Sequence, residues 1–212
     1  MKKNCFKKLG VVVLAGVMFA SVVGCGKSDS ASTNQSTVVN TVEASDSEVF
    51  SSETLDAAQV KLVGKVYDIP FDYSKIAKKV SLKDEMTEQF NVKVPANGTL
   101  DNIYVDVVGK DQSMLLKLAN KSATEEAPTR CRVAGITLQA GTADASTITL
   151  PGGITFESSA YEVETAYGDP DKKIDEKTGF QYVYERANVT YTFSFSREFG
   201  GLQKISFEYT GL

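Results

Sequence analysis

The pattern of apolar and polar residues is clearest near the C-terminus. Three segments, centred on Tyr182, Phe193 and Phe207, alternate large aromatic or aliphatic residues with polar or smaller ones. A period of two is typical of a strand with one buried face and one face in water. Gly200 and Gly201 provide a turn between the second and third segments. The pattern predicts three antiparallel strands with an aromatic face against a core and a hydroxyl-rich face in solvent.

A short helix is predicted immediately before these strands. Ser159 and Glu162 have the spacing of a capping box, in which each side chain satisfies a backbone N–H of the other residue. Val163 lies on the apolar face of the same segment. Gly168 stands where a left-handed residue ends a helix, and Pro170 prevents its continuation. We expect this helix to cover the aromatic face of the strands.

The preceding region, residues 57–142, is less regular. We expect a strand at Val60–Ile69 and a short helix at Tyr73–Val80. Further strand-like runs follow at Phe90–Val94, Ile103–Val108, Met114–Leu118 and Cys131–Leu138. The predicted fold class is therefore α+β, with antiparallel sheets and short helices packed on one face.

A weak internal repeat suggests how the chain is divided. A strand, a proline, a short helix and then further strands occur around Pro70 and again around Pro151. The repeat indicates either two related modules or a coincidence of element order. The predicted organisation has four parts: a signal peptide at 1–24, a lipidated Cys and a tether at 25–56, an N-terminal β-rich module at 57–142, and a C-terminal helix-plus-antiparallel-sheet module at 143–212.

The first residues have the order of a secretory signal peptide. A basic stretch with four lysines precedes the apolar run Leu9–Val23, which is shorter than a membrane span. The run ends in Val22-Val23-Gly24-Cys25, which resembles the lipobox of bacterial lipoproteins. The resemblance implies diacylglycerol transfer to the Cys25 thiol, cleavage after Gly24, and a lipid anchor at the extracytoplasmic face of the cell membrane. The alternative is an ordinary signal peptide with an unrelated cysteine.

The segment after Cys25 has the composition of a flexible tether. Residues 26–56 contain eight Ser, four Thr, six acidic residues and one Lys. Such a segment buries too little apolar surface to offset the entropy of ordering. As a flexible coil it spans about 30 Å between its ends, which is enough to hold a domain away from the bilayer.

Composition excludes several functions. The chain has no His, which removes Ser-His-Asp and Cys-His catalysis and His-ligated zinc. Removing residues 1–24 takes away 4 of the 23 basic residues and none of the 27 acidic ones, so the rest has a net charge of −8. Nucleic-acid binding needs clustered Lys and Arg, which makes this acidic chain a poor candidate. We expect no enzymatic activity, no cofactor and no metal.

Cys131 has no evident partner. With Cys25 acylated and Cys5 in the discarded signal peptide, an intramolecular disulfide is excluded. The favoured interpretation is a small buried apolar residue. The alternative is a reactive or intermolecular thiol.

The C-terminal module resembles a known fold. Gly153–Phe156, Ser158-Ser159, the inward Val163 and Tyr167–Pro170, followed by three strands, are similar to the β-lactamase-inhibitor-protein-like fold, which is shared with small outer-membrane-assembly lipoproteins. That resemblance implies protein binding through a concave sheet face. The full chain also looks like surface lipoproteins of Gram-positive anaerobes.

The polar face of the C-terminal strands is the candidate interaction surface. Its predicted members are Gln181, Glu185, Thr190, Thr192, Ser194, Lys204, Ser206 and Glu208. The alternative is a face that is merely solvated, and the aromatic face opposite is either core or a carbohydrate platform. The function predicted is a non-catalytic binding module for a protein or an envelope polymer. The alternative function is a minor envelope hydrolase or a substrate-capture lipoprotein of a transporter.

Overall fold

The computed structural model describes residues 48–140, 147–198 and 200–211. They belong to one compact unit, Val42–Leu212. The predicted signal peptide, the predicted lipidation site Cys25 and the tether up to residue 47 lie outside the described residues.

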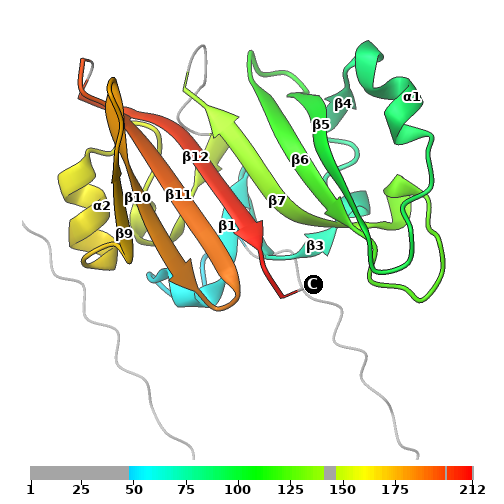
Figure 1. Cartoon of the computed structure of the whole chain (residues 1–212), viewed down its shortest axis with the longest axis horizontal. Coiled ribbons are helices and arrows are strands. Elements are labelled where there is room, and N and C mark those ends of the chain that lie inside the picture. The colour runs from blue at the N-terminus through cyan, green and yellow to red at the C-terminus, as the bar shows by residue number, and fades with distance from the viewer. Residues whose placement is uncertain (1–47, 141–146, 199, 212) are drawn as a thin grey trace, which may run out of the picture. The chain divides into compact units, whose positions relative to one another are not determined.

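Most described strands form one antiparallel sheet, called here the large sheet. In the first half of the chain its strands are β3 (Phe71–Asp72), β4 (Val80–Leu82), β5 (Thr99–Val107), β6 (Ser113–Ala119) and β7 (Arg132–Gln139). In the second half they are β9 (Lys172–Asp175), β10 (Gly179–Arg186), β11 (Val189–Ser196) and β12 (Leu202–Tyr209). The order across the sheet is β4-β5-β6-β7-β12-β11-β10-β9, and β3 also pairs with β7. Figure 1 shows β7 and β12 side by side, where the two halves meet.

A small sheet links the beginnings of the two halves. It has the order β2 (Lys65–Asp68), β1 (Gln59–Leu62) and β8 (Ile148–Thr149). The helices of the described residues are short. They include α1 (Thr87–Phe90), α2 (Ala160–Tyr167) and the 3-10 turns η1 (Leu55–Ala57), η2 (Tyr73–Lys75), η3 (Asp84–Met86), η4 (Pro128–Arg130) and η6 (Pro151–Gly153). The fold is thus mixed and rich in antiparallel sheet, as predicted.

Helix α2 begins and ends where the sequence predicts. Ser159 Oγ accepts a hydrogen bond from Glu162 N at 3.2 Å, and Ser159 N donates to Glu162 Oε2 at 2.7 Å. Gly168 ends the helix with a φ of 77° and a ψ of −166°, a conformation open to glycine that differs from the left-handed helical one expected. Val163 is fully buried. The capping box and the glycine stop therefore set the two ends of the helix by local interactions.

The aromatic face of the C-terminal strands is core. The rings of Tyr184, Tyr191, Phe193 and Phe207 are almost fully inaccessible. Tyr167 of α2 packs on Tyr184 and Phe193 with ring centroids 5.7 Å and 5.9 Å away. Figure 1 shows α2 beside β9 and β10. Because α2 and the core cover these rings, they do not form a carbohydrate platform.

Three predicted elements differ from the structure, and one strand was missed. The expected helix at Tyr73–Val80 is only the 3-10 turn η2, and Val80 begins strand β4. Val60–Ile69 is a hairpin and not one strand, because Val63 and Gly64 turn the chain with φ values of 47° and 81°. The expected strand at Phe90–Val94 is absent: Thr87–Phe90 is helical and Val94 forms only an isolated bridge. Strand β9 was not predicted, because an edge strand with four exposed residues has no alternating burial to signal it.

The packed structure begins before the predicted boundary at residue 57. Leu55 is 2% exposed and belongs to the hydrophobic core. Ser51 N donates to Gln59 Oε1 at 2.8 Å, which ties the preceding residues to β1. The predicted tether, residues 25–56, therefore includes residues that pack on the domain. The predicted end of the tether at residue 56 lies too far along the chain. The composition of this Ser-rich segment does not indicate that its leucine is a core residue.

Candidate functional site

The predicted interaction residues lie on one face of the large sheet. Strand pairing places Gln181, Ser194 and Lys204 in one row across β10, β11 and β12. Thr192 and Ser206 are paired in the next row. The register puts Glu185, Thr190 and Glu208 in a third row. Glu185 and Glu208 are exposed and the other six are partly buried. This surface, called here the open face, lies opposite the face that α2 covers.

The first half of the chain extends the open face beyond the predicted residues. β12 pairs with β7, so Ser206 faces Thr137 and Glu208 faces Gly135. On the other side of β7, Gly135 is paired with Lys117 of β6. One surface therefore runs without interruption from the second half into the first.

A hollow of about 360 Å³ lies on the open face at this junction. Gly135 and Thr137 of β7 lie along its middle, with Lys117 on one side and Glu208 on the other. The residues next to them in sequence, Leu116, Ile136 and Phe207, are buried and turn their side chains to the opposite face. Much of the floor of the hollow is therefore main chain. Gly135 itself is buried.

Lys117 joins three strands by ion pairs across the hollow. Its Nζ lies 2.5 Å from Glu208 Oε1 and 3.5 Å from Asp101 Oδ1. The hydrogen bond to Glu208 raises the pKa of Lys117, and the negative charges of Glu208 and Asp101 act in the same direction, against partial burial. Lys117 therefore carries its positive charge at neutral pH.

An irregularity in β5 directs Asp101 toward Lys117. The β5–β6 register shifts between Leu100 and Ile103, and Asn102 has a φ of 59°. Such a β-bulge leaves extra residues out of the ladder and changes where their side chains point. Asp101 and Asn102 both line the hollow.

A second, smaller hollow of about 150 Å³ adjoins the first. Leu115 and Thr137 line both hollows, and Tyr104, Ser113 and Gln139 line the second. The two hollows share Leu115 of β6 and Thr137 of β7 and are together called here the groove.

The end of this groove is fixed by a small polar network. Asp106 Oδ1 accepts from Ser113 Oγ at 2.5 Å and lies 2.9 Å from Lys83 Nζ. The hydrogen bonds from Ser113 and Lys83 lower the pKa of Asp106, and the bond to Asp106 raises the pKa of Lys83. Lys83 Nζ also lies 5.1 Å from the centroid of the Tyr104 ring. The network holds Tyr104 in place beside the groove.

Sequence reasoning missed Asp101, Lys117, Gly135 and Thr137. Burial along β7 does not alternate cleanly, because Val133 to Ile136 are all buried and only Thr137 interrupts the run. The sequence of β7 also does not reveal that β12 is its neighbour, because the two strands are distant in sequence. The hollow therefore depends on a pairing that no local signal encodes.

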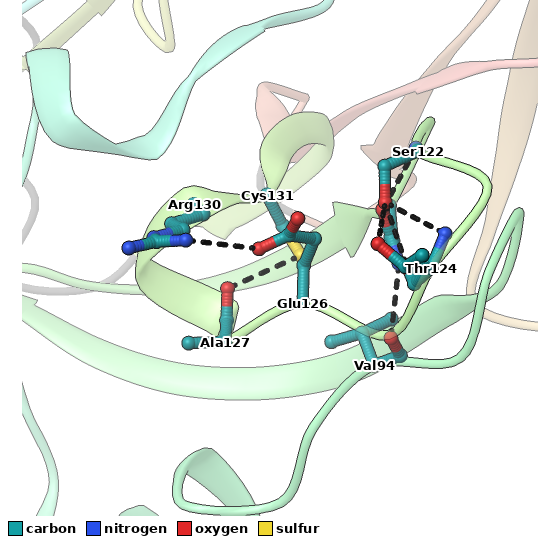
Figure 2. A network of polar contacts seen from close by, with 8 residues as sticks. Val94, Ser122, Thr124, Glu126, Ala127, Arg130 and Cys131 are labelled. Carbon is teal, nitrogen blue, oxygen red and sulfur yellow. Dashed lines mark hydrogen bonds and ion pairs between the residues drawn. The ribbon is translucent and has the colours of Figure 1, made fainter.

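Cys131 lies in a different environment, a polar network of loops near Val94. Figure 2 shows the Cys131 sulfur directed at the main chain of Ala127 and the paired side chains of Glu126 and Arg130. Cys131 Sγ donates to Ala127 O at 3.6 Å, and the Arg130–Glu126 pair spans 3.6 Å. Burial, and secondarily the charge of Glu126, raise the pKa of the Cys131 thiol. The residue is 1% exposed, which agrees with a small buried apolar residue and not with a reactive thiol.

The rest of that network anchors a loop. The Asn120 carboxamide, which is almost fully buried, donates to the carbonyl oxygens of Val94, Pro95 and Thr124 at 2.7–3.0 Å. Its oxygen accepts from Ser122 N at 2.9 Å. Figure 2 shows Ser122 and Thr124 in this cluster. Asn120 has partners on both its oxygen and its nitrogen, so its role here is structural.

Other titratable groups are held in unreactive states. Burial raises the pKa of Tyr167, Tyr184 and Tyr191 well above the ordinary range, so these phenols stay protonated. The hydroxyls of Tyr167 and Tyr184 donate to main-chain carbonyl groups. Among the described residues, no group of three or more His, Cys, Asp or Glu side chains has the arrangement of a metal site.

No family model matches this chain, and no curated protein or solved structure is detectably similar to it. In the part of the chain that the structure describes, no helix has the length and apolar character needed to cross a membrane.

Proposed function

We propose that this chain is a bacterial surface lipoprotein whose folded part is a non-catalytic binding module. A lipid on Cys25 holds it at the extracytoplasmic face of the cell membrane. The support for the anchor is the sequence Val22-Val23-Gly24-Cys25 after a basic stretch and an apolar run. Two acyl chains are sufficient for stable anchoring, whereas one chain binds only marginally.

The binding surface in this proposal is the open face, and its partner is a protein or an envelope polymer. The observation that carries the proposal is the groove along β7, where residues from both halves of the chain line adjoining hollows. A groove lined by charged, hydroxyl and apolar side chains on a rigid sheet offers both contact area and directional groups.

We also propose that the two halves are related modules, similar in arrangement to the β-lactamase-inhibitor-protein-like fold. In each half, four strands follow one another across the sheet, β4 to β7 and β9 to β12. The last strand of each half pairs with the last strand of the other, antiparallel. This mirrored order supports the weak repeat around Pro70 and Pro151.

The anchor is tested by changing Cys25→Ala in the full chain. The variant should take up no fatty-acid analogue in metabolic labelling and should leave the membrane fraction. A labelled Cys25→Ala protein that still pellets with membranes contradicts the anchor.

The binding surface is tested with one substitution on each side of the sheet. Thr192 lies in the middle row of the open face, whereas Tyr161 is 76% exposed on α2. Thr192→Arg should abolish capture of the native partner from crosslinked membranes, and Tyr161→Arg should not. Both variants should melt near the wild-type temperature. Loss of capture by Tyr161→Arg alone would place the binding surface elsewhere.

A further inference from the structure

Lys117 is held between two carboxylates that come from opposite halves of the chain. Glu208 belongs to β12 and Asp101 to β5, and their carboxylate oxygens lie 2.5 Å and 3.5 Å from Lys117 Nζ. β7 lies between β6 and β12 in the sheet, so the Lys117–Glu208 pair crosses over Gly135. Neighbouring strands lie about 4.8 Å apart, so the main chains of β6 and β12, on either side of β7, are about 9–10 Å apart. The lysine must extend across the sheet to make this contact.

Gly135 leaves the space that the contact needs. A Cβ at this position would lie 3.1 Å from Phe207 O and 3.2 Å from Lys117 Cβ. Any larger side chain would push Lys117 aside and fill the hollow. The hollow of about 360 Å³ that remains beside Lys117 has the volume for one further side chain.

The charge around this recess is incompletely neutralised. Among the residues that line it, Lys117 is the sole cation, while Asp101 and Glu208 are both acidic. The carboxylate side chains are 48% and 54% exposed, whereas Lys117 is 25% exposed. The oxygens therefore remain accessible to a second cation from solvent, and the surplus negative charge favours one.

The spacing of the two hollows fits an extended peptide. Along β7, the first hollow is lined by Gly135 and Thr137, and the second by Thr137 and Gln139. Two residues along a strand span about 7 Å, which is also the distance between side chains on one face of an extended segment. A peptide along β7 would place side chains i and i+2 in the two hollows.

We infer that the hollow over Gly135 receives a basic side chain, of Arg type, from an extended segment of a protein partner, and that Lys117 occupies this cation site in the free protein. The inference rests on the proposed function and names its partner chemistry. A guanidinium has five N–H donors in a planar fork and bridges two carboxylates better than an ammonium. Its alkyl stem packs on Leu115, and residue i+2 of the segment lies beside Tyr104. Arg is also common among the residues that dominate binding energy at interfaces.

The inference predicts opposite effects for residues that touch each other. Asp101→Asn with Glu208→Gln removes the attraction for the incoming cation and should weaken its binding. Lys117→Met removes the internal competitor and leaves both carboxylates free, so it should strengthen binding by roughly 2- to 5-fold, the range for an exposed ion pair. A purely structural role of Lys117 would give the reverse sign or no change.

The test uses the acetylated and amidated hexapeptide Ser-Thr-Arg-Thr-Leu-Ser and the same peptide with Gln in place of Arg. Binding to the full folded chain is followed by NMR shifts of the Gly135 amide and by calorimetry, for wild type, Lys117→Met and the Asp101→Asn/Glu208→Gln double variant. The control Asp175→Asn changes a carboxylate on edge strand β9 that pairs with Arg197. Thermal melting establishes that each variant is folded. We expect a preference for the Arg peptide that is largest in Lys117→Met, unchanged in Asp175→Asn and lost in the double variant.

Equal binding of the Arg and Gln peptides by wild type and Lys117→Met would overturn the inference. So would shifts of the Gly135 amide caused by soluble cell-wall glycan fragments and not by the Arg peptide. Capture of the native partner distinguishes the two proposals. If Thr192→Arg abolishes capture and the double variant does not, the cation site is wrong and the open face remains. If neither variant affects capture, both proposals fail.

Discussion

Tyr167, in the last turn of α2, and Phe193, in the middle of β11, lie with their ring centroids 5.9 Å apart. This contact shows which face of the large sheet packs against α2 and belongs to the core. Since side chains alternate along a strand, Thr192 next to Phe193 must point to the open face. A shift of one residue in register would exchange the two faces completely.

The contact predicts unequal effects for two adjacent substitutions. Phe193 has no exposed surface, so Phe193→Ala should lower the free energy of unfolding by about 3–5 kcal/mol. Thr192→Ala, on the open face, should lower it by less than about 1 kcal/mol. Urea unfolding of the two variants beside wild type measures both values. A Phe193→Ala protein as stable as wild type would mean that the ring is not in the core.

A second prediction concerns where the folded part begins. Leu55 is 2% exposed, whereas Val49 is 74% exposed. Leu55→Ala should therefore cost about 2–5 kcal/mol of unfolding free energy, as other buried leucines do. Val49→Ala serves as the matched control and should cost less than about 0.5 kcal/mol. Similar stability of the two variants would restore the boundary at residue 57.

Local signals in the sequence were sufficient for part of the fold. The capping box of Ser159 and Glu162 and the stop at Gly168 act within α2, and they gave its bounds correctly. Strand β11 alternates strictly, and β10 and β12 alternate over part of their length, because one face of these strands is core and the other meets solvent. In both cases the information lies within a few residues of the element, which is why a single sequence reveals it.

Only the part of the candidate site that the second half of the chain contributes could be predicted. Glu208 was identified, because its own strand alternates. Its ion-pair partner Lys117 was not, since 91 residues separate the two in sequence and a β7 residue lies between them in space. Gly135 also carries no side chain whose character would signal a role. Pairing between distant strands, and recesses that arise from it, are decided by the packing of the whole domain.

A third prediction concerns the thiol of Cys131. Because burial raises its pKa, the thiolate that reacts with disulfide reagents is scarce and inaccessible in the folded protein. A chain that starts at residue 26 has Cys131 as its one cysteine. It should react with Ellman's reagent slowly in native buffer and with one equivalent in 6 M guanidinium chloride. The exposed position Ser81, changed to Cys, is the control and should react at once. Prompt reaction of native Cys131 would show that its loop opens readily.

The last prediction concerns stability in acid and depends on Asp171. Its Oδ2 accepts hydrogen bonds from Glu185 N at 2.7 Å and from Arg186 Nη1 at 2.5 Å. These two bonds, the main-chain one first, lower the pKa of Asp171 below its ordinary value. A carboxyl group with a lowered folded-state pKa stabilises the protein above its unfolded-state pKa of about 3.9. That stabilisation is lost as the pH falls through the lower, folded-state pKa.

Asp171→Asn should therefore be less stable than wild type at pH 7, and the difference between the two should shrink as the pH falls below about 4. The reason is that protonation removes from wild-type Asp171 the same charge that the substitution removes. Thr192→Ala is the control, because no titratable group changes and its difference from wild type should be the same at both ends of the range. Urea unfolding at several pH values between 7 and 3 gives these differences directly. The difference in unfolding free energy between Asp171→Asn and wild type could instead stay constant or widen toward low pH. That result would mean that the contacts of Asp171 with Glu185 N and Arg186 do not favour its charged form.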